Sequence, residues 1–89
     1  MEHGVYCVYD SKAEAYIAPF CASNDAVCMR QLSEIVNSDS GHVFAKHPSD
    51  FTLFRLGWFS EETGNFNLQE AKSNLCVLAE LKETDSAEG

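Results

Sequence analysis

The stretch FTLFRLGWF, residues 51–59, decides how this chain folds. Aromatic residues and threonine are enriched in strands, and the run is dense in them. The side chains at its even positions and those at its odd positions are both largely apolar. A strand of this kind is central and covered on both faces, or it is covered on one face and pairs with another subunit.

The chain after this strand predicts a turn and a second strand. Residues 60–64 (SEETG) place Gly64 where a turn needs positive φ, and residues 65–69 (NFNLQ) return as a strand. Residues 70–82 are ambiguous. Helical spacing fits Ala71, Leu75, Leu78 and Ala79, whereas strand alternation fits Leu75, Val77, Ala79 and Leu81. The content of alanine, glutamate, lysine and leucine tilts this segment slightly toward helix.

The chain before the central strand predicts a hairpin. Residues 5–9 (VYCVY) and 15–20 (AYIAPF) have strand composition, and the turn residues at 10–12 separate them. Pro19 cannot donate a ladder hydrogen bond, so it indicates an edge position or the end of the strand.

One amphipathic helix lies between the two pairs of strands. Asn24 and its neighbours Ser23 and Asp25 form a helix-start signal, and Gly41 favours a stop after residues 37–40. Between them, apolar residues recur at helical spacing: Cys28, Leu32, Ile35 and Val36. Residues 42–50 form a connection.

The predicted order is therefore β-β-α-β-β followed by an ambiguous C-terminal element. It indicates a small α+β domain in which one helix covers one face of an antiparallel sheet. The other face is solvated or buried against a partner. We expect residues 1–82 to form this single domain and residues 83–89 to form an acidic, disordered tail.

Charge restricts the function. Fourteen acidic residues against six basic ones give a formal net charge of −8. This charge argues against strong nonspecific binding to nucleic acid, which basic residues drive. It does not exclude a local basic patch. The chain has no apolar run of roughly 20 residues and its N-terminus lacks a signal-peptide pattern, so we expect a cytosolic protein with no membrane association.

The residues that could carry chemistry have no recognisable pattern. The four cysteines form no Cys-x-x-Cys pair, and the three histidines have no metal-ligand spacing, so we expect free thiols and no metal or cofactor. His47, Ser49 and Asp50 are close in sequence, but a turn fixed by Pro48 explains them better than a catalytic triad. We expect no enzymatic activity.

A nucleic-acid site requires cations beside aromatic rings. Arg55 lies mid-strand among Phe54, Trp58 and Phe59, and it is the main candidate. If it shares an open sheet face with Phe51 or Phe59, bases could stack there while the guanidinium contacts phosphate. The whole candidate set is Arg55, Arg30, Lys46, His47, Phe51 and Phe59. The alternative, which we favour from sequence alone, is that the aromatic residues are core and Arg55 pairs with one of the chain's own acids.

Several short motifs occur in an order that matches a known family. They are Val8-Tyr9-Asp10, Pro19-Phe20, Asn24-Asp25, Arg30, His47-Pro48-Ser49-Asp50-Phe51, Leu53-Phe54-Arg55-Leu56-Gly57 and Thr63-Gly64. The set covers residues 5–68 and resembles the small nonstructural protein of gokushovirus-type microviruses, which are single-stranded DNA phages. The resemblance implies a role in viral DNA replication, or in its switch to single-stranded genome synthesis, in the host bacterial cytoplasm.

Two kinds of partner follow as expectations. The resemblance favours single-stranded DNA. The acidic surface and the apolar 51–59 strand favour an adaptor or inhibitor that binds a host or viral replication protein. A homodimer is expected under either hypothesis, because the second face of the sheet needs a cover.

Overall fold

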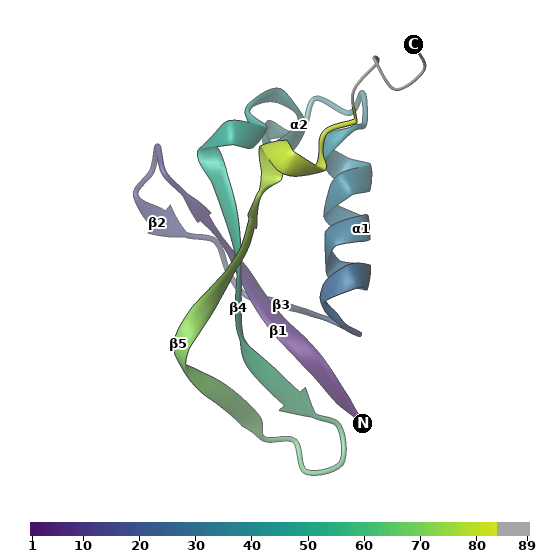
Figure 1. The fold of residues 1–89 in the computed structure, drawn as a ribbon, viewed down its shortest axis with the longest axis vertical. Coiled ribbons are helices and arrows are strands. Elements are labelled where there is room, and N and C mark those ends of the chain that lie inside the picture. The colour runs from purple at the N-terminus through teal and green to yellow at the C-terminus, as the bar shows by residue number, and fades with distance from the viewer. Residues whose placement is uncertain (84–89) are drawn as a thin grey trace.

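The computed structural model describes residues 1–83, which form a five-stranded antiparallel sheet with one long helix packed against one face (Figure 1). This confirms the predicted α+β class. The strands are β1 (Glu2–Asp10), β2 (Ala15–Tyr16), β3 (Phe20–Ala22), β4 (Phe51–Ser60) and β5 (Phe66–Val77). Of the predicted acidic tail, residues 84–89 lie outside the described part of the chain.

Strand β4 is central, as one of the two alternatives predicts, but α1 covers only one of its faces. It pairs with β1 on one side and with β5 on the other, in the order β2-β1-β4-β5, and β3 also pairs with β1. The turn between β4 and β5 contains Gly64 at φ 75°, which confirms the predicted need for glycine there.

Helix α1 (Asp25–Val36) begins where the sequence predicts. The side chain of Asn24 caps it by accepting a 2.9 Å hydrogen bond from the backbone N–H of Val27. Its apolar stripe packs against the sheet and forms the core with side chains from β1, β4 and the C-terminal end. The fully or nearly fully buried members are Tyr6, Val8, Ala22, Cys28, Leu32, Val36, Phe44, Phe51, Leu53, Cys76 and Leu78.

The prediction of one continuous strand over residues 15–20 is wrong. The structure divides it into β2 and β3, which pair with opposite halves of β1. Pro19 lies in the interruption and cannot donate a ladder hydrogen bond. The last hydrogen bond before the interruption joins the Ile17 amide to the Val8 carbonyl, and pairing with β1 resumes at Phe20.

The slight preference for helix in residues 70–82 is also wrong. Strand β5 continues to Val77, and only Leu78–Leu81 form a short 3₁₀ helix, η2. Local composition favours helix, but pairing with the open edge of β4 satisfies the backbone and buries Cys76 opposite Leu53. Tertiary pairing overrides a weak local propensity here.

The connection between α1 and β4 contains two short helices, α2 (Val43–Lys46) and η1 (Pro48–Asp50). His42 caps α2, since its Nδ1 accepts a 3.0 Å hydrogen bond from the amide of Phe44. The Phe44 ring is buried with its centroid 4.8 Å from that of Phe51. This connection therefore covers the start of β4.

Candidate nucleic-acid interface

The register of the strands decides which side chains share a face of the sheet. Directly opposed residues on neighbouring strands point to the same side. Tyr6 opposes Arg55, and Arg55 opposes Ser73, so these three lie on the face that α1 covers. Leu56 is an extra residue in β4, and residues 69–72 bulge out of β5 beside it. The opposite face, which α1 does not cover, is called the open face below.

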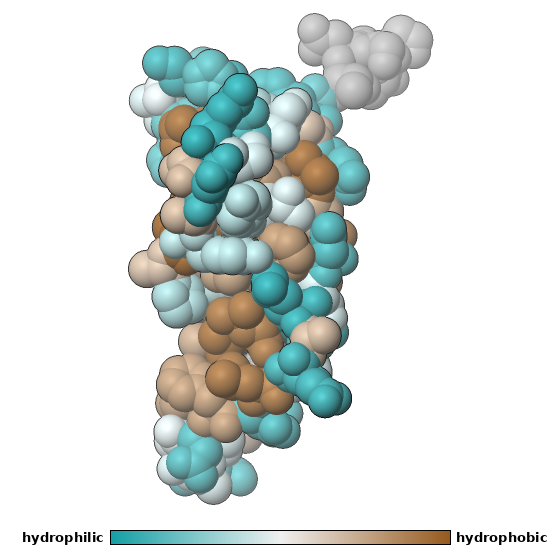
Figure 2. All heavy atoms as spheres, turned by 90° about the vertical axis from the view of Figure 1, so that its left-hand side faces the viewer, coloured by the Kyte–Doolittle hydropathy of each residue, from teal (hydrophilic) through white to brown (hydrophobic). Residues whose placement is uncertain are grey.

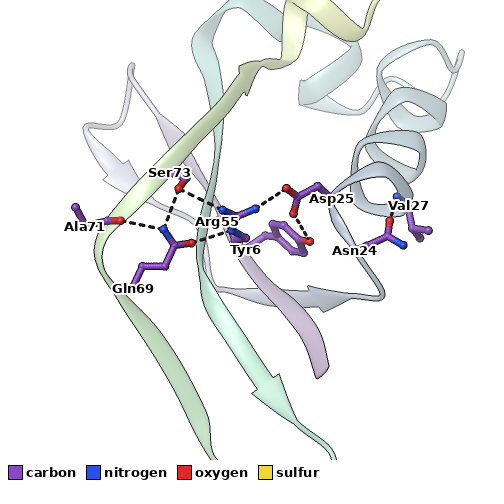
Figure 3. A network of polar contacts seen from close by, with 8 residues as sticks. All are labelled: Tyr6, Asn24, Asp25, Val27, Arg55, Gln69, Ala71 and Ser73. Atoms are coloured by element: carbon purple, nitrogen blue, oxygen red, sulfur yellow. Dashed lines mark hydrogen bonds and ion pairs between the residues drawn. The ribbon is translucent and has the colours of Figure 1, made fainter. Parts of the chain in front are cut away.

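Arg55 joins the start of α1 to the bulge in β5 (Figure 3). Its Nη1 donates to Asp25 Oδ2 at 2.5 Å, and its Nε donates to Gln69 Oε1 at 2.8 Å. Asp25 Oδ1 accepts a 2.8 Å bond from the hydroxyl of Tyr6, and Gln69 Nε2 donates to Ser73 Oγ at 2.9 Å. The ion pair confirms one part of the alternative that the sequence favoured, in which one of the chain's own acids neutralises Arg55. Its other part is wrong, because Phe54 and Trp58 are only partly buried and do not belong to the core.

The surroundings of Tyr6 favour the protonated form of its phenol. Burial, and next the hydrogen bond to Asp25, raises the pKa of the Tyr6 phenol well above its ordinary value. Tyr6 therefore stays a donor to Asp25 at physiological pH. The Arg55 guanidinium also lies 5.0 Å from the centroid of the Trp58 ring. Together these contacts make Arg55 a structural residue that links α1 to the sheet.

The other five candidate residues do not gather around Arg55. Phe51 is 2% exposed and belongs to the core, so its ring is not an open stacking platform. Phe59 is half-buried on the open face, opposite His3 and Phe66. The remaining candidates, which are Arg30 on α1, Lys46 on α2 and His47 just after it, are exposed. Arg55 therefore shares no open face with either ring, because Phe51 is buried on the covered face with it and Phe59 lies on the opposite face.

The open face instead carries a cation that sequence analysis did not select. Lys72 is exposed, and its Nζ lies 5.2 Å from the ring centroid of Tyr16 and 5.6 Å from that of Phe54. The Tyr9 ring lies beside that of Tyr16, with 4.8 Å between the two ring centroids. We call these four residues, Tyr9, Tyr16, Phe54 and Lys72, the Lys72 cluster. Within residues 1–83, Lys72 makes no ion pair.

The sequence contained only a weak signal for this cluster. Lys72 lies in the ambiguous segment, and a helix there would point it elsewhere. Even the strand alternative does not place it, because four residues of β5, 69–72, face the single residue Leu56 of β4 between Arg55 and Gly57. Such a bulge changes which face each later side chain occupies.

A second group on the open face is apolar. Phe59 and Phe66 lie with ring centroids 5.2 Å apart, and Leu68 opposes Gly57 two positions further along. We call Phe59, Phe66 and Leu68 the hairpin patch. Figure 2 views the molecule from the open side and shows a large apolar area in the lower half of this face, with smaller apolar groups above it among hydrophilic atoms.

The three buried thiols are poor nucleophiles, because burial raises the pKa of each. All four cysteines are free, and Cys7, Cys28 and Cys76 are buried. Desolvation, and next the charge of the nearby Asp25, raise the pKa of Cys28 to about 11. Within the described part of the chain, no three histidine, cysteine or acidic side chains come together as a metal site. No helix among these residues is long and apolar enough to cross a membrane.

Comparison with known proteins agrees with the resemblance drawn from the sequence. The phage ORF5 protein family matches residues 3–81. Protein ORF5 of Chlamydia phage 1 is 30% identical over 64 residues, which cover 68% of this chain and 67% of that protein. No solved structure matches. These two matches confirm the predicted resemblance to a small phage protein of gokushovirus-type microviruses.

Proposed function

The chain belongs to the phage ORF5 protein family, and from that premise we propose that it acts, without catalysis, in replication of the viral DNA or in its switch to single-stranded genomes. We propose that it does so in the host cytoplasm by binding single-stranded DNA at the Lys72 cluster. The observation that carries the proposal is the exposed ammonium of Lys72 above the rings of Tyr16 and Phe54 on an uncovered sheet face.

The chemistry of the cluster suits a single strand better than a duplex. Unpaired bases stack on aromatic rings without regard to sequence, and a nearby cation contacts the backbone phosphate. Tyr16 is 50% exposed, so its ring offers a surface to a base. A duplex hides the faces of its bases inside the stack and gains nothing from such rings.

The net charge sets the expected strength. With a formal charge of −8, the whole protein repels a polyanion, and one lysine supplies little counterion release. We therefore expect binding that is weak, is detected at low salt and is lost as salt rises.

The test is fluorescence anisotropy of a labelled oligothymidylate titrated with the full chain at two salt concentrations. Replacing Lys72 with glutamine should weaken binding about fivefold at low salt and lower the salt slope by about 0.7, the value for one phosphate contact on a single strand. Tyr16→Leu keeps the apolar bulk but removes the ring, and it should weaken binding by at least about fivefold.

Lys46→Gln is the matched control, because it removes the same charge from another exposed lysine. It also tests the candidate that the sequence suggested. Equal losses in Lys46→Gln and Lys72→Gln would show that only net charge matters, and the proposed site would then be wrong. Absence of binding at low salt by the unaltered protein would overturn DNA binding altogether.

A further inference from the structure

The hairpin patch exposes more large apolar surface than its neighbours on the sheet. Phe66 is 61% exposed and Leu68 is 63% exposed, although both belong to a strand with fixed pairing. On β1, Val5 opposes Gly57 on this face and is only 4% exposed. On this face the apolar side chain on β1 is therefore buried, whereas those of Phe66 and Leu68 on β5 are exposed. Adjacent exposed apolar side chains of this size mark interaction sites more often than plain surface.

Strands β4 and β5 approach closely beneath the patch. A Cβ atom placed on Gly57 would lie 2.4 Å from the carbonyl oxygen of Asn67 and 2.7 Å from the Cα of Leu68. Only glycine leaves room for this approach. The backbone under Leu68 is thus fixed by close packing, and the patch is formed before any partner arrives.

The charged side chains near the patch are mainly acidic. Residues 56–71, which contain the β4–β5 hairpin, include Glu61, Glu62 and Glu70 and neither lysine nor arginine. Two basic groups lie there as well: His3, whose Nε2 lies 2.6 Å from Glu61 Oε2, and the amino group of Met1, which is close enough to help lower the pKa of Glu61. A symmetric pair of copies would bring these acids together, whereas a basic partner would neutralise them.

We propose that the hairpin patch is a docking site for a short segment of another protein that carries apolar side chains flanked by lysine or arginine. The apolar side chains cover Phe66 and Leu68, and the basic ones meet the carboxylates at the turn and at Glu70. Segments of this composition occur in proteins that handle nucleic acid. The site is separate from the Lys72 cluster and does not depend on DNA binding.

The test uses a labelled synthetic peptide in which leucine and lysine alternate, titrated into the full chain. Leu68→Ser should weaken binding by about tenfold, because it removes a buried apolar contact without changing any charge. Val43→Ser is the matched control, since Val43 is 46% exposed on α2, and it should leave binding unchanged. A peptide with serine in place of leucine should not bind detectably.

Three results would overturn this proposal. Equal binding by Leu68→Ser and the unaltered protein would mean that charge alone attracts the peptide. Equal loss in Val43→Ser would place the peptide elsewhere. A concentration-dependent dimer in sedimentation equilibrium that Leu68→Ser abolishes would mean that a second copy covers the patch. Lys72→Gln should not alter peptide binding, which separates this result from the fate of the DNA proposal.

Discussion

Two cations of this protein lie over aromatic rings on opposite faces of one sheet, and they differ in what neutralises them. Arg55 lies over Trp58 and is held by Asp25 under the start of α1. Lys72 lies over Tyr16 and Phe54, and within residues 1–83 it has no acidic partner. The same pairing of cation and ring is therefore structural where a helix supplies an anion, and it is available to a ligand where no helix covers the sheet.

The largest expected effect separates these two roles by stability. Arg55→Met should lower the free energy of unfolding by about 2 kcal/mol, because it leaves Asp25 and Gln69 without their partner in a half-buried site. Lys72→Met should change it by less than about 0.5 kcal/mol, as for an exposed side chain. Urea unfolding of both variants measures the difference. Equal losses would remove the structural distinction between the two cations.

Alkaline pH should also affect the two faces unequally. Burial raises the pKa of Cys28, on the covered face, from an ordinary 9.0 to about 11. The folded state therefore holds a proton that the unfolded state releases. This stabilisation is complete below pH 9 and is lost as the pH rises through 11, by about 3 kcal/mol. Burial also raises the pKa of Cys7, on the open face, but nearby Lys72 opposes the shift.

Urea unfolding at a series of pH values compares the two thiols. Cys28→Ala should flatten the decline in stability between pH 9 and 11, and Cys7→Ala should flatten it less. The slope is the relevant quantity, because either substitution can lower stability at every pH by leaving a small cavity. A larger change in slope for Cys7→Ala would contradict the assignment of the more strongly desolvated thiol to the covered face.

The smallest expected effect is at the turn of the β4–β5 hairpin. The hydrogen bond from His3 lowers the pKa of Glu61 below its ordinary 4.5. A lowered pKa stabilises the fold above that ordinary value, and the contribution is lost as the pH falls through the folded value. Glu61→Gln should therefore reduce slightly the loss of stability at acid pH, and it should leave the contacts of Arg55 and Lys72 unchanged. An unchanged acid titration curve in this variant would show that the contact is not formed in solution.

Much of the fold could be predicted because its signals are local. The Asn24 cap, the apolar spacing from Cys28 to Val36 and the glycine turn at Gly64 each depend on a few neighbouring residues. The division of the 15–20 strand was partly signalled by Pro19. The strand at 70–77 was not, because its stability comes from pairing with β4 and its own composition favours helix.

The sequence by itself determined the class of the fold, the central place of residues 51–59 and the family. These follow from hydrophobic periodicity and motif order, which the chain carries without reference to distant residues. Only the tertiary structure decided which cation is free. That depends on the Leu56 and 69–72 bulges, which set the face of every side chain beyond them, and on the arrival of Asp25 from α1 beside Arg55. Local composition determines neither the register of a bulged strand nor a contact such as that between Arg55 and Asp25, which are 30 residues apart in the chain.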